Sequence, residues 1–302
     1  VQRDGDCFQR ASFFDWKFDV PFHLIMGSSK MGESYLYWHG ERLFQMNCTY
    51  LSDADQWINS PGFVDGDAAY ARPIFAGCID CHATYADLRR PPNHFTPNSL
   101  ILGVSCERCH GPGKEHVDFH RTHPNETHAH GVTVPSKLSR QAQMDVCGQC
   151  HTANKRMNDR RPFQFRPGDR LEDHYDMLED DGTFSDRVHT SNQVARLGLS
   201  ECFLQSEMGC AECHNPHSNE RGESKLFSQR CLKCHDQEHC GFSEDLALPL
   251  SDNCIDCHMP RRAGKLHADT AGDRIFPPLR DHYIRVDQQA TRQYLDRLQA
   301  IE

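Results

Sequence analysis

The chain has 302 residues, of which 33 are basic, 43 acidic, 20 His and 16 Cys, and only 37% are hydrophobic. A mean hydropathy of -0.71 is too low for an ordinary aliphatic core of that size, so another apolar component must fill the interior. The formal charge of -10 argues against a nucleic-acid partner, because phosphate binding needs clustered Lys and Arg. No apolar run approaches the roughly 18 residues of a transmembrane helix and no signal peptide opens the chain, so we expect an already processed polypeptide without a transmembrane segment.

The first predicted element is a small β-rich segment at 1–76, which contains none of the cysteine motifs described below. The runs ESYLYW at 33–38 and RLFQMNCTY at 42–50 are rich in aromatic and β-branched residues and flank a His-Gly pair. Two such runs around a turn residue indicate a β-hairpin.

The second segment, 77–262, carries six copies of the pattern Cys-x-x-Cys-His, at 78–82, 106–110, 147–151, 210–214, 231–235 and 254–258. This is the attachment signature of haem c. Two Cys three residues apart lie on one side of a helical turn and reach both vinyl groups of one porphyrin, and the His that follows binds the iron. Zinc also binds paired Cys, but zinc does not explain why His follows every pair.

We therefore predict six covalent haems, with a short helix at each attachment site. The predicted thioether cysteines are Cys78, Cys81, Cys106, Cys109, Cys147, Cys150, Cys210, Cys213, Cys231, Cys234, Cys254 and Cys257. The predicted proximal ligands are His82, His110, His151, His214, His235 and His258. With about 50 residues per haem, porphyrin must form much of the interior. The predicted fold is a mostly irregular and α-helical multihaem cytochrome built around stacked haems, with the small β-rich segment at its N-terminus.

Two longer helices are expected. The first covers 191–206, which starts with Ser and Asn. The second ends the third segment, 263–302, as an amphipathic helix over 288–301. Its apolar face consists of Ala290, Tyr294, Leu295, Leu298 and Ile301. We favour packing of this face on the body of the protein over an exposed helix that binds a partner.

The six motif histidines leave fourteen of the 20 His as candidates for the sixth ligand of each iron. Two neutral imidazoles give a low-spin, six-coordinate iron, which suits electron transfer rather than substrate binding. His116 and His217 follow a proximal His by six and three residues, across Pro and Gly turns. Each is therefore expected to serve a neighbouring haem rather than its own.

Several segments resemble the large family of periplasmic multihaem c-type cytochromes. They are GVSCERCHGPG at 103–113, HTSNQ at 189–193 before CAECHNPH at 210–217, and CIDCHMP at 254–260 followed by DHYI at 281–284. That family includes the tetrahaem nitrification cytochromes and, more distantly, hydroxylamine oxidoreductase and pentahaem nitrite reductase. Relatives often carry a further haem motif before the β-rich segment and helical repeats at the C-terminus, which this sequence lacks, so we expect a short version of the family or an excerpt.

The resemblance implies a set of distal ligands. His116, His189, His217 and His282 match the family pattern, and His120 and His267 complete the predicted set of six bis-histidine irons. The runners-up are His23, His94, His123 and His174.

Covalent haem attachment takes place outside the bacterial cytoplasm, so we predict an exported, periplasmic or extracellular protein. An oxidising location allows disulfides between the four Cys outside the motifs, and we predict that Cys202 pairs with Cys240 and Cys7 with Cys48. Four buried thiols are the alternative. The acidic stretch 176–181 could hold calcium, although a solvated loop is favoured.

The predicted function is an electron-transfer conduit rather than an enzyme. Its expected partners are other redox proteins or cytochromes, including copies of itself in a larger complex or filament. The alternative is a multihaem oxidoreductase acting on small nitrogen or sulfur compounds at one five-coordinate haem. That alternative needs an iron with an open face and acid or base residues beside it, and family likeness alone does not supply either.

Overall fold

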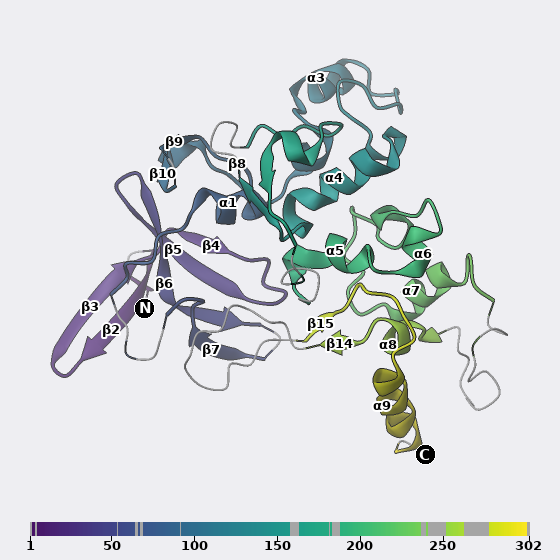
Figure 1. The fold of residues 1–302 in the computed structure, drawn as a ribbon. Helices are drawn as coiled ribbons and strands as arrows, with labels where there is room; N and C mark the ends of the chain where they lie inside the picture. Colours follow the sequence, from purple (N-terminus) through teal and green to yellow (C-terminus); the bar gives the residue numbers. More distant parts are fainter. Residues whose placement is uncertain are drawn as a thin grey trace. The chain divides into compact units, whose positions relative to one another are not determined.

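The computed structural model describes residues 2–3, 5–52, 54–63, 66, 69–90, 92–157, 163–180, 182, 188–236, 240, 252–262 and 278–300. The chain forms two compact units (Figure 1). Unit 1 comprises the described residues of Val1–Pro135 and Lys155–Leu178, and unit 2 those of Ser136–Asn154, Glu179–Lys265 and Pro278–Glu302. The first two attachment motifs thus belong to unit 1 and the other four to unit 2. Within the described ranges, no helix combines the length and apolar character needed to cross a bilayer.

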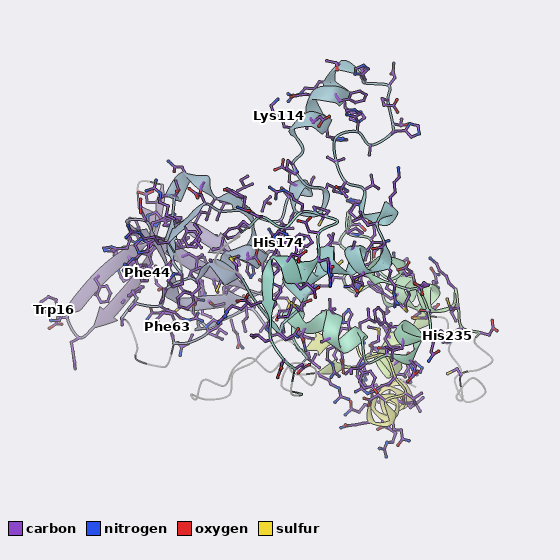
Figure 2. The ribbon with its side chains drawn as sticks, turned by 45° about the horizontal axis from the view of Figure 1, so that its top comes forward. Trp16, Phe44, Phe63, Lys114, His174 and His235 are labelled. Carbon is purple, nitrogen blue, oxygen red and sulfur yellow. The ribbon has the colours of Figure 1, made fainter. Side chains whose placement is uncertain are left out.

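Unit 1 begins with two antiparallel sheets. Strands β1 (Gln2–Arg3), β2 (Asp6–Phe13) and β3 (Trp16–Pro21) form the first, and the exposed Trp16 marks the tip of its β2–β3 hairpin (Figure 2). Strands β4 (Leu24–Met26), β5 (Glu33–His39), β6 (Arg42–Leu51) and β7 (Gln56–Asn59) form the second in that order. The predicted hairpin is confirmed by the β5–β6 pair, in which His39 pairs with Arg42 and Gly40 takes the positive φ of +60° that a tight turn needs.

The second sheet carries the apolar core of unit 1. Leu36 on β5 and Leu43 on β6 are 1% and 0% exposed and pack with Phe95. Ile79 belongs to the same cluster, although it lies between the two cysteines of the first motif. The sheet therefore packs against the first attachment helix through apolar side chains.

The rest of unit 1 consists of short elements. In chain order they are α1 (Ala76–His82), β8 (Ala83–Tyr85), β9 (Leu88–Arg90), β10 (His94–Phe95), η1 (Pro97–Ser99), β11 (Ile101–Leu102), α2 (Cys106–His110), α3 (Lys114–Thr122), β12 (Lys155–Met157), η3 (Leu171–Asp173) and β13 (Tyr175–Met177). The strands form two-stranded sheets β8–β11, β9–β10 and β12–β13. The helix η2 (Pro135–Lys137) lies where the chain passes from unit 1 to unit 2.

Unit 2 is mostly helical. Its elements are α4 (Arg140–His151), η4 (Thr190–Asn192), α5 (Gln193–Leu197), α6 (Glu201–Leu204), η5 (Cys210–Glu212), α7 (Ser224–Cys231), α8 (Ile255–His258), β14 (Arg261–Arg262), β15 (Leu279–Arg280) and α9 (Gln288–Gln299). The prediction of one helix over 191–206 is wrong, because the chain breaks between α5 and α6. Ser200, between the two helices, has an extended backbone rather than a helical one. Its hydroxyl accepts a hydrogen bond from Ile284 N–H at 2.8 Å.

The predicted terminal helix is confirmed as α9. Asp287 caps its N-terminus by accepting from Ala290 N–H at 2.9 Å. Ala290 is buried, and the Thr291 side chain hydrogen-bonds the thiol of Cys257, so the helix packs on α8 as favoured. The end of the predicted helix, 301, lies outside the described residues.

Candidate haem-attachment sites

In unit 1 a buried charge cluster joins the first two motifs. Asp80, in the middle of the first motif, is 1% exposed and Arg108, in the middle of the second, is 5% exposed. Arg108 Nη2 donates to Asp80 Oδ1 at 2.6 Å and to its carbonyl oxygen at 2.8 Å. Tyr175 donates to Asp80 Oδ2 at 2.7 Å, and Lys155 Nζ lies 3.6 Å from the same oxygen. Because the carboxylate has a partner on each oxygen, the helices α1 and α2 are fixed to one another and to the β12–β13 hairpin.

The side chain of Thr84 also fixes the distance between the first two attachment helices. Thr84, on the strand that follows α1, accepts from Ser105 N–H at 2.8 Å and donates to Gly103 O at 2.7 Å. Ser105 precedes α2 directly, so the strand pair β8–β11 sets the start of the second attachment helix relative to the end of the first.

Several of the histidines predicted as proximal ligands are oriented by backbone carbonyls. The Nδ1 atoms of His110, His151 and His258 lie 2.8, 2.6 and 3.1 Å from the carbonyl oxygens of Thr133, Thr190 and Arg285, respectively. When Nδ1–H donates to a carbonyl, the lone pair of the neutral ring is on Nε2 and is available to a metal. This orientation suits the iron of a haem bound by the same motif.

The protonation of other motif histidines points the same way. Burial lowers the pKa of His82. Burial, and after it the charge of Arg230, lowers the pKa of His214. The neutral imidazole is the form that binds a metal, and a lowered pKa favours this form.

One distal candidate, His282, lies beside the motif histidine His214. The rings of His282 and His214 have their centroids 6.0 Å apart and their planes 19° apart. His282 Nδ1 lies 3.2 Å from Arg280 O, and burial lowers the pKa of His282 to about 4. A metal–imidazole bond of about 2.0–2.1 Å places the centroids of two axial rings about 6 Å apart, so this pair has the spacing of two ligands on one iron.

Apolar side chains beside the motifs also fit a porphyrin. Phe75, just before α1, is 48% exposed, and Leu102 and Val104, just before α2, are 61% and 59% exposed. Each of these exposed apolar side chains is close in sequence to an attachment motif, where a porphyrin could cover it. The donor set, the tautomers and this apolar surface together fit haem c.

The first cysteines of neighbouring motifs in unit 2 lie together. The sulfur of Cys147 lies close to that of Cys210, and the sulfur of Cys231 lies close to that of Cys254. Cys210 Sγ is also 3.6 Å from Met144 Sδ. The attachment points of the third and fourth motifs, and of the fifth and sixth, are therefore adjacent.

The distal candidates of α3 lie on one helical face. The rings of His116 and His120 have centroids 4.5 Å apart, which is too short for two axial ligands of one iron, so they can serve only separate irons. His116 Nδ1 lies 2.9 Å from His130 O. His120 Nε2 is buried and meets no hydrogen-bond partner among the described residues. Both rings therefore keep Nε2 for a metal.

The remaining predicted distal ligands differ in what the structure shows. His189 Nδ1 accepts a hydrogen bond from Ser191 N–H at 3.1 Å and lies 2.7 Å from Ser191 Oγ, so this ring nitrogen is an acceptor, as in His23. His217 is on an exposed turn after the fourth motif, where its N–H donates to Asn215 at 3.0 Å. His267 lies outside the described residues.

Among the runners-up, His94 and His23 use a ring nitrogen to accept a hydrogen bond, from Arg42 Nε at 2.8 Å and from Trp38 N–H at 3.1 Å, respectively. The His123 ring stacks on Phe119 at 4.3 Å.

His174 (Figure 2) differs from these three. It is 7% exposed and its Nε2 lies 2.9 Å from Asp169 Oδ2, while its buried Nδ1 has no hydrogen-bond partner among the described residues. Among the runners-up, His174 is therefore the best placed to bind a metal.

Neither predicted disulfide is present, because Cys7, Cys48, Cys202 and Cys240 are all free thiols. The Cys48 thiol instead has the Gln9 side chain as its hydrogen-bond partner. Cys202 lies near Cys234 and Cys240 near Cys257, so each spare thiol of unit 2 accompanies a haem motif rather than the other spare thiol. In the acidic stretch, Asp176 pairs with Arg156 at 3.1 Å, and Asp181 lies outside the described residues.

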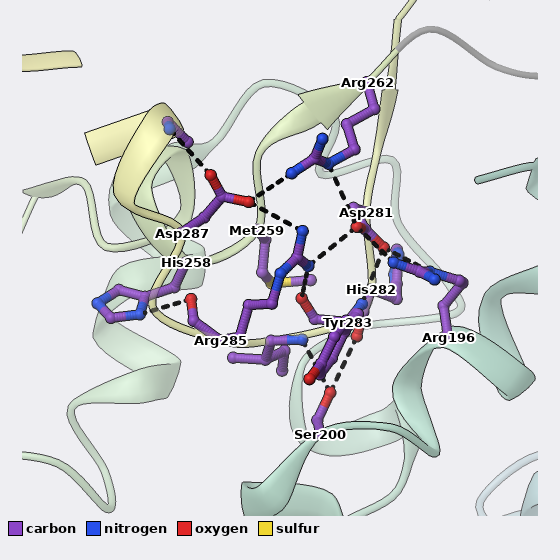
Figure 3. A network of polar contacts seen from close by, with 12 residues as sticks. Arg196, Ser200, His258, Met259, Arg262, Asp281, His282, Tyr283, Arg285 and Asp287 are labelled. Carbon is purple, nitrogen blue, oxygen red and sulfur yellow. Dashed lines mark hydrogen bonds and ion pairs between the residues drawn. The ribbon is translucent and has the colours of Figure 1, made fainter. Parts of the chain in front are cut away.

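Sequence reasoning missed the charge network around the segment that carries His282. Figure 3 shows Asp281 between the guanidinium groups of Arg196, Arg262 and Arg285. The only signal in the sequence was the motif DHYI, which was used for its His and not for its Asp.

Comparison with known proteins shows which proteins the chain resembles. A family model described as cytochrome c554 and c-prime matches residues 47–111, which include the first two motifs. The multiheme cytochrome MtrA of Shewanella baltica (strain OS185) is 27% identical over 176 residues, covering 56% of this chain and 46% of that protein. The chain thus spans about half the length of this curated relative. The crystal structure of the outer cell wall cytochrome OcwA shares the fold, with a TM-score of 0.54 and 16% identity over 88% of this chain and 68% of that one. These similarities support a multihaem c-type cytochrome with covalently bound haem.

Proposed function

We propose that the chain is a hexahaem c-type cytochrome that conducts electrons outside the cytoplasm. The observation that carries the proposal is the spacing of the His214 and His282 rings, with centroids 6.0 Å apart, at one of six Cys-x-x-Cys-His motifs. Haem c supplies one-electron exchange at an iron with two axial imidazoles. An iron with both axial positions filled has no place for a substrate, which favours a conduit over an enzyme.

We propose the six motif cysteine pairs as the thioether sites and the six motif histidines as the proximal ligands. The proposed distal ligands are His116, His120, His189, His217, His267 and His282. The relation to nitrification cytochromes and hydroxylamine oxidoreductase stays a prediction.

The residues of unit 2 support conduction by placing attachment points together. The sulfurs of Cys147 and Cys210 lie close together, as do those of Cys231 and Cys254. Electrons pass most readily between redox groups in contact, so this arrangement favours transfer within the motif pairs three–four and five–six.

Further redox proteins are the proposed partners, which agrees with what the names of the relatives describe: a multiheme cytochrome and an outer cell wall cytochrome. An exported location and assembly with further copies of the chain in a complex or filament are part of the proposal. A formal charge of -10 opposes self-association, so assembly should strengthen as salt screens the repulsion.

The test combines three measurements on the matured protein. Denaturing mass spectrometry should give the polypeptide plus six haem masses. Electron paramagnetic resonance of the oxidised protein should show low-spin iron alone, and a small cytochrome should reduce and reoxidise it. Five or fewer haems would refute the count, a high-spin signal would favour the enzyme, and haems that exchange no electrons with the partner would refute the conduit.

A further inference from the structure

The segment that carries His282 is tied to α5 by a buried ion pair. Asp281 is 0% exposed, and the Arg196 side chain is 8% exposed. Arg196 donates to both carboxylate oxygens, from Nε to Oδ1 at 2.8 Å and from Nη2 to Oδ2 at 2.7 Å (Figure 3). Two parallel hydrogen bonds fix the direction of the pair as well as its distance.

The Ser200 side chain fixes the backbone of the same segment. Its hydroxyl donates to His282 O at 3.2 Å and accepts from Ile284 N–H at 2.8 Å. Asp281 Oδ1 also accepts from Tyr283 N–H at 3.0 Å. Hydrogen bonds therefore hold the residues on both sides of His282 and the carbonyl of His282 itself. These bonds are additional to any contact of the His282 ring.

The ring that this segment carries is the one that faces His214 at 6.0 Å. Asp281 is the neighbour of His282 in the chain, so a shift of the Asp281 backbone displaces the His282 ring directly. The Nδ1 contact to Arg280 O adds orientation, because Arg280 is itself held by Asp256 Oδ1 at 2.8 Å.

We propose that Arg196, Asp281 and Ser200 form a positioning lock that holds His282 on the distal side of the haem attached at 210–214. The proposal rests on the proposed function, since it takes His282 as an iron ligand. The three residues are positioning residues, because they act on the iron only through His282.

The charges around Asp281 decide which variants test the lock. Besides Arg196, Arg285 Nη1 lies 3.1 Å and Arg262 Nε 3.6 Å from Asp281 Oδ2. Asp281→Asn keeps the shape but leaves these guanidinium groups around a neutral amide, so the segment should move away. Arg196→Lys keeps the charge but replaces the two parallel bonds by a point contact, which is the milder change.

A matched control lies in the same network. Asp287 is 7% exposed and binds Arg285 at 2.9 Å and Arg262, which are two of the arginines that also surround Asp281. Asn caps a helix as well as Asp does, so Asp287→Asn should retain α9. It removes the same charge from the same cluster without releasing the lock.

The experiment measures carbon monoxide binding to the dithionite-reduced proteins, each first shown by mass to carry the full set of haems. A six-coordinate iron resists carbon monoxide, whereas an iron that has lost its distal His binds it and shifts its Soret band. His282→Ala should bind carbon monoxide at one haem, the wild type and Asp287→Asn at none, and Asp281→Asn and Arg196→Lys should give the difference spectrum of His282→Ala.

The outcomes separate the two proposals. If His282→Ala binds no carbon monoxide, the ligand assignment fails and the lock fails with it. If His282→Ala binds it but Asp281→Asn and Arg196→Lys do not, the lock is refuted and the ligand stands. If Asp287→Asn binds it equally, the effect is general loosening and the lock is also refuted. Should Asp281→Asn not mature, Arg196→Lys decides.

Discussion

Replacing Asp80 by Asn tests the charge cluster that joins the attachment motifs of unit 1. Asp80 and Arg108 are 1% and 5% exposed and lie 2.6 Å apart, and the Lys155 side chain beside them is 8% exposed. Asn keeps the volume, so no cavity forms, but Arg108 and Lys155 lose their counter-charge in a buried place. Breaking a buried pair in this way costs about 3–5 kcal/mol, which is a large part of the stability of one domain.

The natural assay is tryptophan fluorescence during guanidinium unfolding. All three Trp of the chain, Trp16, Trp38 and Trp57, belong to unit 1, so the signal follows that unit. The midpoint should fall while the slope stays the same, because the substitution changes stability and not the surface exposed on unfolding.

A neighbouring variant supplies the control. Asp176 is on the same hairpin as Tyr175, but it and Arg156 are 49% and 73% exposed at a distance of 3.1 Å. An exposed pair contributes less than about 1 kcal/mol, so Asp176→Asn should barely move the midpoint. If Asp80→Asn loses no more stability than Asp176→Asn, the buried cluster does not stabilise unit 1 and the reasoning is wrong.

Three further predictions concern other features. The hydrogen bonds of Arg230 lower the pKa of Glu220 to about 2, so the pair stabilises unit 2 fully above the unfolded pKa of about 4.3 and loses that effect as the pH falls towards 2; Glu220→Gln should flatten acid unfolding in this range by circular dichroism, and an unchanged profile would contradict it. A Cβ at Gly131 would lie 2.9 Å from Glu115 and 3.0 Å from His116 N at a φ of +67°, so Gly131→Ala should lower the fluorescence midpoint more than Gly103→Ala, which has a φ of +72° but open space. Alkylation of the unfolded protein without reductant should label all four thiols outside the motifs. Protection of any pair from labelling would show that this pair forms a disulfide, against the structure.

Local patterns account for what the sequence predicted well. The β5–β6 hairpin and α9 were readable because alternation and helical periodicity are properties of a few consecutive residues. The attachment motifs were readable because the covalent chemistry requires its two Cys and its His within five positions. The helix expected over 191–206 failed where Ser200 bonds to residues more than eighty positions away, which no local pattern encodes.

The distal ligands show the same limit. Fourteen His compete for the role, and all have the same chemistry, so composition cannot rank them. What separates them is the partner of each ring nitrogen. His282 faces His214, whereas His94 is engaged by Arg42, and His174 combines a buried open nitrogen with a support from Asp169. These differences arise from contacts between distant segments.

The distribution of apolar residues leads to a last prediction, about folding without haem. Of the buried hydrophobic residues that the structure describes, sixteen belong to unit 1 and six to unit 2. The six are Met144, Val146, Val188, Leu197, Ile255 and Ala290. Buried ion pairs such as Arg196–Asp281 add specificity but little net stability, so they do not replace an apolar core. We therefore expect porphyrin to supply most of the buried apolar surface of unit 2. Protein made without cytochrome c maturation should keep slowly exchanging amides in β5 and β6 and lose them in α4 and α9, measured by hydrogen exchange. Equal protection of α4 and α9 with and without haem would show that the chain alone folds unit 2.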